Sequence, residues 1–538
     1  MKKKLLSLAL ALTLGLGVLT VPAAAASTAV VKTFGEEVEP AFNYRVYSDG
    51  MLAAEKDYPF DSAASGYIFL DRDGNEIPGA LFADAMNFSE GMAAAAPKLT
   101  KSSGYKGYGY IDKTGKMVIT PRFETAGQFH GGLARVKDQE TGKWGMIDTS
   151  GNVVIPFEYG SNNNGPYVHE VSDGLIAAYN SADGYWGYFD TTGQTAIPFQ
   201  YANANDFKNG YAKVRLGQRE TYIDKFGRDI IPQQYEYIEQ LTVDGEPAAL
   251  FSARDTTATG RNAYYLLNGN GQVVAGPYDS FGRGGFDKGF FNGLMAATRN
   301  DGSNSLTGYI NTAGQEVIPC QFRDAKVFKD GYAFVRTQDN TGAIINTAGQ
   351  ITAILSENIK YHTSTDDPSG LLGWGEGFLA VSSDESGRTR SGFINTAGQL
   401  VVDYKYQSVE AFSSGVAVVR NFDNQCGLIN TAGQEIVPCK YTSIGKFING
   451  VAVVSVVHHK GSLGNVYGYG LINTAGQEIL PCKYDEGISS IESGSVGALQ
   501  DSLQKGGQEV CAILRNLDTD LYDFIRITTD YAAAPAQP

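Results

Sequence analysis

The sequence predicts an all-β protein built from tandem units, and three observations support this fold class. A turn motif of the form Asn/Asp-x-x-Gly recurs about every 40 residues along the 538-residue chain. A second motif, Phe-x-x-Gly-x-Ala-x-Val, recurs between these turns. The composition, with 65 glycines, 31 tyrosines and 27 phenylalanines, favours short strands and tight turns over helices.

The turn motif predicts a β-hairpin in each unit. A strand such as Gly-Tyr-Ile-Asn leads into the turn, where Asn or Asp bonds to the backbone and Gly takes the left-handed conformation. A second strand such as Gln-Glu-Val-Ile follows and stops at Pro, which cannot donate to a ladder. Eleven turn glycines share this frame: Gly74, Gly115, Gly151, Gly193, Gly227, Gly271, Gly314, Gly349, Gly398, Gly433 and Gly476.

The second motif predicts a third strand whose small and apolar residues alternate, as in a tightly packed interior. It occurs twelve times, from residues 46–54 to residues 491–499, which is once more than the turns. We predict that residues 510–520 form a further, degenerate hairpin that caps the array. Identical Asn-Thr-Ala-Gly-Gln turns occur only from Asn311 onward and indicate a recent duplication of the C-terminal half.

These motifs resemble the WG (KWG) repeat family. The best match is Lys143-Trp144-Gly145-Met146-Ile147-Asp148, and Trp186-Gly187 also matches well. The family glycine is missing at Ile68, Thr221 and Tyr265, so we expect distorted units there. The resemblance covers about residues 45–515. It implies a secreted or envelope repeat protein of bacteria, and it implies no reaction.

The unit size predicts a β-propeller-like assembly, with a β-solenoid or open superhelix of hairpins as the alternative. Eleven or twelve units exceed the four to eight blades of most propellers. Two rings of five to six units, one large ring and an open spiral therefore remain. The extra third strand favours a ring because it allows the two ends to complete each other.

We divide the chain into a signal peptide at 1–26, an N-terminal leader at 27–44, repeats at 45–355 and 356–520, and a C-terminal tail at 521–538. The basic start, the apolar run at 5–21 and the small residues up to Ala26 predict secretion or surface attachment, with cleavage after Ala26. The long insertion at 356–370 is predicted to be a loop over one face or a joint between two halves of the array, and 242–261 is a second candidate for this role.

The formal net charge of −15 disfavours nucleic acid and anionic lipid as partners. No second run of 18 apolar residues occurs, so we expect no membrane segment after signal removal, and a monomer.

The sequence holds no local motif for nucleophilic, metalloprotease or phosphate chemistry, and we predict no enzyme activity, no cofactor and no metal. The turn role explains Asp112, Asn311 and the segment 71–76 without a metal. His458 and His459 are placed in an exposed inserted loop at 457–467. Cys426 and Cys439 flank one hairpin, so a cross-strand disulfide is a hypothesis there.

Exposed aromatic residues are the best candidates for a binding surface because they stack on sugars and anchor protein partners. Phe129, Phe412 and Trp374 belong to a repeated column and are predicted to be core. Aromatics in inserted segments are the surface candidates: Tyr167, Tyr185, Tyr361 and Tyr467. We therefore expect a non-enzymatic scaffold that binds a protein or an envelope glycan. An extracellular polysaccharide hydrolase or lyase and a purely structural surface component are the alternatives.

Overall fold

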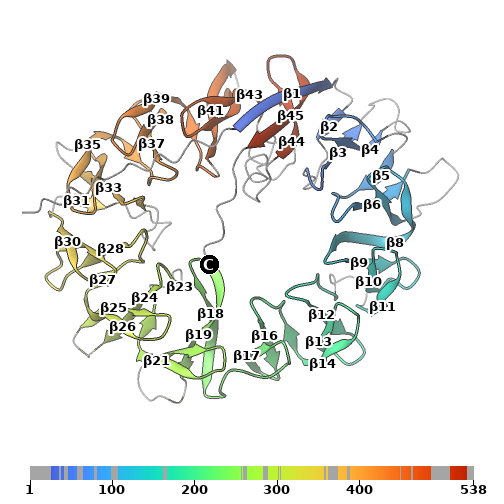
Figure 1. The fold of residues 1–538 in the computed structure, drawn as a ribbon, viewed down its shortest axis with the longest axis horizontal. Coiled ribbons are helices and arrows are strands. Elements are labelled where there is room, and N and C mark those ends of the chain that lie inside the picture. Colours follow the sequence, from blue (N-terminus) through green and yellow to red (C-terminus); the bar gives the residue numbers. More distant parts are fainter. Residues whose placement is uncertain are drawn as a thin grey trace, which may run out of the picture.

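The computed structural model is a single ring of β-sheets, nearly all of whose strand pairs are antiparallel, around a central opening (Figure 1). The residues that the structure describes are 26–34, 38–40, 47–56, 65–77, 81–98, 107–160, 167–255, 257, 263–282, 289–300, 302, 304–356, 359–361, 373–383, 388–448, 450–461, 464–485 and 509–529. Every regular element among them is a strand. Accordingly, this part of the chain has no helix with the length and hydrophobicity to cross a membrane.

The strands follow one another around the ring in chain order. Those up to the middle of the chain are β1 (Ala26–Phe34), β2 (Val38–Pro40), β3 (Met51–Lys56), β4 (Gly66–Asp71), β5 (Phe82–Ala85), β6 (Met92–Pro97), β7 (Tyr108–Asp112), β8 (Met117–His130), β9 (Leu133–Asp138), β10 (Trp144–Asp148), β11 (Val153–Tyr159), β12 (Leu175–Asn180), β13 (Tyr185–Asp190), β14 (Thr195–Tyr201), β15 (Asn203–Ala204), β16 (Tyr211–Leu216), β17 (Arg219–Asp224), β18 (Tyr235–Val243), β19 (Glu246–Asp255), β20 (Tyr264–Asn268), β21 (Val273–Tyr278), β22 (Ser280–Phe281) and β23 (Gly289–Phe290).

The remaining strands complete the ring. They are β24 (Leu294–Asn300), β25 (Ser305–Asn311), β26 (Glu316–Phe322), β27 (Asp324–Ala325), β28 (Tyr332–Arg336), β29 (Gly342–Asn346), β30 (Ile351–Ile354), β31 (Ile359–Tyr361), β32 (Trp374–Gly375), β33 (Phe378–Ser383), β34 (Arg390–Asn395), β35 (Leu400–Tyr406), β36 (Ser408–Val409), β37 (Val416–Arg420), β38 (Cys426–Asn430), β39 (Glu435–Tyr441), β40 (Ser443–Ile444), β41 (Val451–Gly461), β42 (Gly464–Asn473), β43 (Glu478–Tyr484), β44 (Glu509–Asn516) and β45 (Leu521–Thr529).

A regular unit is a sheet of four strands, as in the order β36-β37-β38-β39. The Gly-x-Ala strand β37 lies toward the opening and β39 toward the outside (Figure 1). Long β8 belongs to two units, because it pairs first with β7 and then with β9. The core lies between neighbouring sheets, where the predicted core residues Phe129, Phe412 and Trp374 are buried.

The predicted hairpin turns are confirmed. The Gly433 N–H donates to the Asn430 carbonyl at 2.9 Å, and the Asn430 side-chain oxygen accepts the Ala432 and Gln434 N–H groups, each at 3.0 Å. All eleven predicted turn glycines have positive φ, between 73° and 84°. Asp71 makes the same side-chain bonds to Asp73 and Asn75, so segment 71–76 is such a turn.

The glycine after Trp is required by a close approach between strands. A Cβ at Gly145 would lie 2.5 Å from the Ile155 carbonyl oxygen, beside a register shift in the β10–β11 ladder. The outer strand is reduced to one isolated bridge beside Thr221, and it is similarly short beside Ile68. Beside Tyr265, β20 and β21 still pair, but their sheet is irregular as predicted, because it has five strands and β23 runs parallel to β18.

Neighbouring units are joined by a repeated contact that we call a clasp. In the described residues, a two-residue turn precedes the third strand, and its first residue has positive φ, for example 53° at Glu90. At seven of these turns the side chain of that residue accepts a backbone N–H from the corresponding turn of the next unit. The clasps run from Asp49 to Gly91, Glu90 to Gly131 and Gly132, Asp173 to Gly210, Asp244 to Asn292, Asn292 to Gly331, Asp330 to Glu376 and Glu376 to Gly415.

The ring closes because its first and last strands pair. Antiparallel β1 and β45 pair from Ala26 opposite Thr529 to Phe34 opposite Tyr522, with one register shift between Val30 and Lys32. The predicted capping hairpin exists as β44–β45, and residues assigned to the leader and the tail supply β1 and β45. The structure thus selects the single large ring from the three arrangements that the sequence left open.

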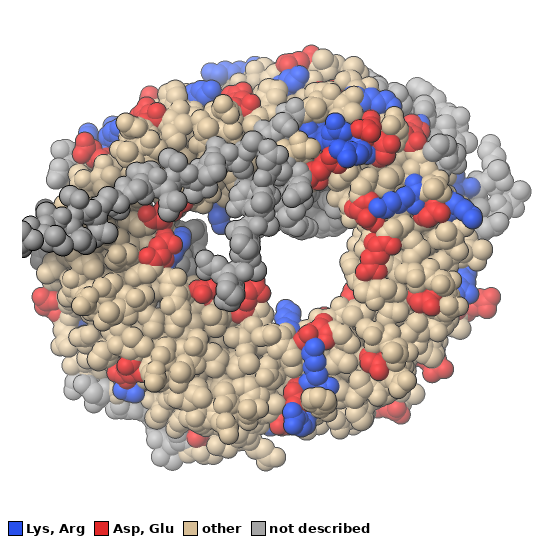
Figure 2. All heavy atoms as spheres, in the orientation of Figure 1, with Lys and Arg blue, Asp and Glu red and all other residues tan. Residues whose placement is uncertain are grey.

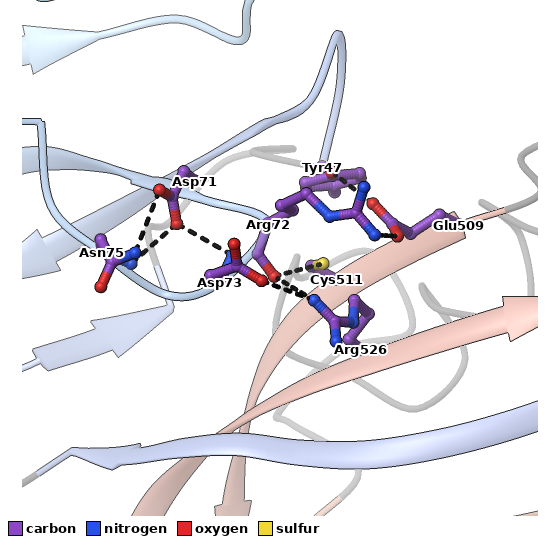
Figure 3. A network of polar contacts seen from close by, with 8 residues as sticks. All are labelled: Tyr47, Asp71, Arg72, Asp73, Asn75, Glu509, Cys511 and Arg526. Carbon is purple, nitrogen blue, oxygen red and sulfur yellow. Dashed lines mark hydrogen bonds and ion pairs between the residues drawn. The ribbon is translucent and has the colours of Figure 1, made fainter.

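Polar contacts reinforce the same closure (Figure 3). Arg72 forms an ion pair of 2.6 Å with Glu509, and Arg526 forms one of 2.7 Å with Asp73. The Tyr47 hydroxyl donates to Glu509 at 3.0 Å, and burial is the main cause that raises the pKa of Tyr47. The turn after β4 and the β44–β45 hairpin therefore each supply one arginine and one carboxylate to the contact that closes the ring.

Two candidate loops are hairpins in the structure. Segment 242–261 begins with the β18–β19 turn, and segment 457–467 is the extended end of the β41–β42 hairpin. His458 accordingly lies on a strand, not in a loop, with Nε2 3.5 Å from an Asp518 oxygen. Most of segment 356–370 and all of segment 491–499 lie outside the described residues.

Candidate functional site

A cavity of about 350 Å³ lies where three consecutive units meet. Its size is within the range of small-ligand sites. The segment before β12 contributes His169, and the turn between β15 and β16 contributes Asn205, Asp206 and Lys208. Strand β16 adds Tyr211 and Lys213, β17 adds Tyr222, and β18 adds Gln240.

The cavity lies toward the inner side of the ring. Strands β12, β16 and β18 occupy the sides of their sheets that are nearer the opening (Figure 1). The space-filling view shows Lys, Arg, Asp and Glu side chains gathered over this part of the ring, next to the opening (Figure 2). Asn205 and Lys208 of the cavity wall are exposed, so a ligand can approach this cavity from solvent.

His169 is held in place from two sides. Its Nδ1 lies 2.7 Å from an Asp206 oxygen, and its ring meets the edge of Trp186 with 5.0 Å between centroids. Trp186 packs on Tyr179, which in turn packs on Tyr167 at 5.1 Å. This chain of rings connects the cavity to the family tryptophan and fixes the orientation of the imidazole.

Aromatic rings and hydrogen-bonding groups share the cavity wall. Burial raises the pKa of Tyr211 and of Tyr222, so both hydroxyls stay protonated at neutral pH. The Tyr222 hydroxyl accepts the Gln240 backbone N–H at 3.2 Å, which leaves its own proton for a ligand. Lys213 forms an ion pair of 2.8 Å with Glu220, and the hydrogen bond from Lys213 lowers the pKa of Glu220.

The four predicted surface tyrosines do not form one site. Tyr185 is exposed at the start of β13, and Tyr167 is half-buried in the ring stack beside the cavity. Tyr467 is half-buried on β42, far along the chain, opposite Val457. Tyr361 belongs to β31, and its side chain is outside the described part.

The cysteines and the possible metal ligands of the described residues do not come together in a second site. All five cysteines are free thiols, so Cys426 and Cys439 form no disulfide. Burial raises the pKa of the Cys426 thiol, which makes it a weak nucleophile. In the described ranges, no three or more His, Cys, Asp or Glu side chains gather as a metal ligand set.

Most cavity residues were missed at the sequence level, although a signal exists. Asp206 directly precedes Phe207, in the column where earlier units hold Asn87 and Gln128. This column varies between units while the Phe column is repeated. Comparing such variable columns between consecutive units would have selected Asp206 as a residue that the fold does not require.

The WG containing repeat model matches seven segments of the chain: residues 108–140, 144–178, 186–219, 308–341, 392–424, 427–456 and 469–498. The second and third of these segments contribute most of the cavity wall, and Tyr222 and Gln240 lie outside them. No curated protein matches the sequence.

Three solved structures are similar at low identity. A eukaryotic initiation factor is 10% identical, with a TM-score of 0.28, over 61% of this chain and 92% of its own. The tricorn protease is 11% identical, with a TM-score of 0.24, over 88% and 56%. BamB from Moraxella catarrhalis is 13% identical, with a TM-score of 0.23, over 58% and 96%.

Proposed function

We propose that this chain, which belongs to the WG containing repeat family, is a secreted or surface-associated, non-enzymatic scaffold that binds an envelope glycan. The observation that carries the proposal is the cavity between the units of β12, β16 and β18. It combines two tyrosine rings with side chains that donate and accept hydrogen bonds. Sugars need this combination because their C–H faces stack on rings while their hydroxyls bond to polar groups.

The location of the scaffold is part of the proposal. Residues 1–26 carry the features of a secretory signal, and β1 begins at Ala26. Cleavage after Ala26 would leave the closing strand from Ser27 onward intact. N-terminal sequencing of the protein from the culture medium tests this: a start at Ser27 is expected, and a start beyond Phe34 would contradict it.

A glycan array probed with residues 27–538 tests the binding function. We expect retention on a restricted set of envelope-type glycans, without a change in their length. His169→Ala should weaken retention at least tenfold, because it removes a ring from the wall. His130→Ala is the control, since His130 is exposed on another unit. Equal retention of the two variants, or no retention by any of the proteins, would reject this site.

One observation favours a second candidate, a polysaccharide lyase or hydrolase. The Asp206 carboxylate fixes Nδ1 of His169, as in a histidine that moves a proton at Nε2. Asp206 is, however, the one carboxylate among the residues that line the cavity, whereas most glycoside hydrolases use two. Shortened glycan products that disappear in His169→Ala would favour the enzyme over the scaffold.

A further inference from the structure

We propose that the cavity selects a sugar that carries a carboxylate, such as a uronic acid, and that Lys208 is its charge partner. This inference rests on the proposed function and adds the ligand class to it.

Of the charged side chains that line the cavity, Lys208 is the one that is not already paired with another described side chain. Asp206 is engaged by His169 at 2.7 Å, and Lys213 is engaged by Glu220 at 2.8 Å. The Lys208 side chain is exposed and makes no ion pair or hydrogen bond with any side chain that the structure describes. A ligand anion beside Lys208 therefore gains attraction without first breaking an existing ion pair.

The turn that carries Lys208 is held on both sides. The Gly210 N–H donates to Asp173 of the preceding unit at 2.5 Å, and Asn209 Nδ2 donates to the Pro247 carbonyl of the following unit at 2.8 Å. Gln240 Nε2 also donates to the Lys208 carbonyl, at 3.3 Å. Because its backbone is fixed before a ligand arrives, only the side chain of Lys208 has to be ordered to make the contact.

The remaining wall suits a carboxylate on a sugar better than a phosphate. Phosphate sites favour arginine forks or a helix N-terminus, and the lining contains no arginine and no helix among its described residues. The amide of Asn205 and the hydroxyl of Tyr222 are neutral donors, which suit sugar hydroxyls and the second carboxylate oxygen. A single cation among neutral donors matches a ligand with one negative charge.

Isothermal titration with matched oligosaccharides tests the inference. Short uronic acid oligomers are compared with their carboxyl-reduced, neutral counterparts of the same length and with sulfated counterparts. The wild-type chain from residue 27 should bind the uronic acid form at least tenfold more tightly than both. Higher salt should reduce this preference, because salt screens an exposed charge pair.

Lys208→Gln should remove the preference and leave the binding of the neutral form unchanged. The control is Lys143→Gln, since Lys143 is also exposed and its side chain has no partner in the part of the chain described. Equal or tighter binding of the neutral or sulfated form, or a preference that survives Lys208→Gln, overturns the selectivity and leaves the glycan function standing. No binding of any form rejects both.

Discussion

The Thr33 hydroxyl donates to the carboxylate of Asp523 at 2.8 Å, across 490 residues of sequence. The same carboxylate accepts the Tyr484 hydroxyl at 3.1 Å and Asn516 Nδ2 at 2.9 Å. Asp523 is buried, and its charge is satisfied by donors from β1, β43 and β44. One carboxylate thus joins the first strand of the chain to the last two units of the ring.

Removing this carboxylate should destabilise the closure. Asp523→Ala would leave the buried Tyr484 and Asn516 donors without their acceptor, which costs about 3 kcal/mol when a charged partner is lost. Thr33→Val removes one hydrogen bond of an exposed residue, which costs about 1 kcal/mol. Thermal unfolding of both variants measures the difference, and an equal shift of the melting temperature would contradict the role of Asp523.

The clasps should contribute to stability through their acceptors. Glu90→Ala removes the acceptor of two N–H groups, from Gly131 at 2.7 Å and Gly132 at 2.9 Å. We expect a loss of about 1 kcal/mol, since the contact is exposed. Ser414→Ala is the control, because Ser414 occupies the same turn position with no clasp in the described residues. A melting temperature that falls equally in both variants would show that the turn, and not the clasp, is responsible.

The family glycine should not tolerate a methyl group. Gly145→Ala would place a Cβ 2.5 Å from the Ile155 oxygen and 2.6 Å from the Phe157 ring, so the two strands must separate. Overpacking of this kind costs about 1–3 kcal/mol. Gly445→Ala is the matched control, because its nearest atom is at 3.5 Å and its φ is not positive. Denaturant midpoints of the two variants should differ, and equal midpoints would refute the steric account.

The aspartates of the hairpin turns should make the stability of the fold decrease at low pH. Hydrogen bonds within the turn, first from Thr114 to Asp112 and from Asn152 to Asp148, hold the pKa of each carboxyl below its usual value. A pKa that is lower in the folded state stabilises the fold above the unfolded pKa of about 3.9, and this contribution is lost as the pH falls further.

Asparagine at both turns should therefore remove part of the acid response. Asn311 makes equivalent bonds, to the Ala313 and Gln315 N–H groups, so the Asp112→Asn, Asp148→Asn double variant keeps the turn geometry. The melting temperatures of variant and wild type should be similar at pH 7. Below about pH 4 the wild type should lose stability faster than the variant, and parallel curves from pH 7 to pH 2.5 would contradict this.

The sequence predicts those features that local chemistry decides. The turn from Asn430 to Gly433 needs only its own residues, so its motif is readable at every copy. The buried ring of Phe412 likewise follows from a column that repeats. These features account for the strands, the hairpins and the stacking of units, which together define the fold class.

The offset between the two motifs favours a ring, but the residues that close it and those that line the cavity depend on contacts between distant positions and could not be predicted. Strand β1 carries neither repeat motif, and its partner β45 lies at the other end of the chain. His169 and Asp206 are 37 residues apart, and they meet only because consecutive sheets turn around a common axis. A local pattern does not contain the curvature of the ring.

Interior units and the closing unit differ in how the sequence encodes them, and this difference affects how the ring can evolve by duplication. Apart from β22 and β23, which are exchanged between two neighbouring sheets, the strands of each interior sheet come from a continuous segment, whereas the closing sheet takes β1 from one end of the chain and β44–β45 from the other. Copying an interior segment would leave the residues that close the ring untouched and would widen the central opening. The five identical turns from Asn311 onward are consistent with such copying. The number of units, and with it the circumference of the ring, can then change by one duplication at a time, while the pairing of β1 with β45 stays the same.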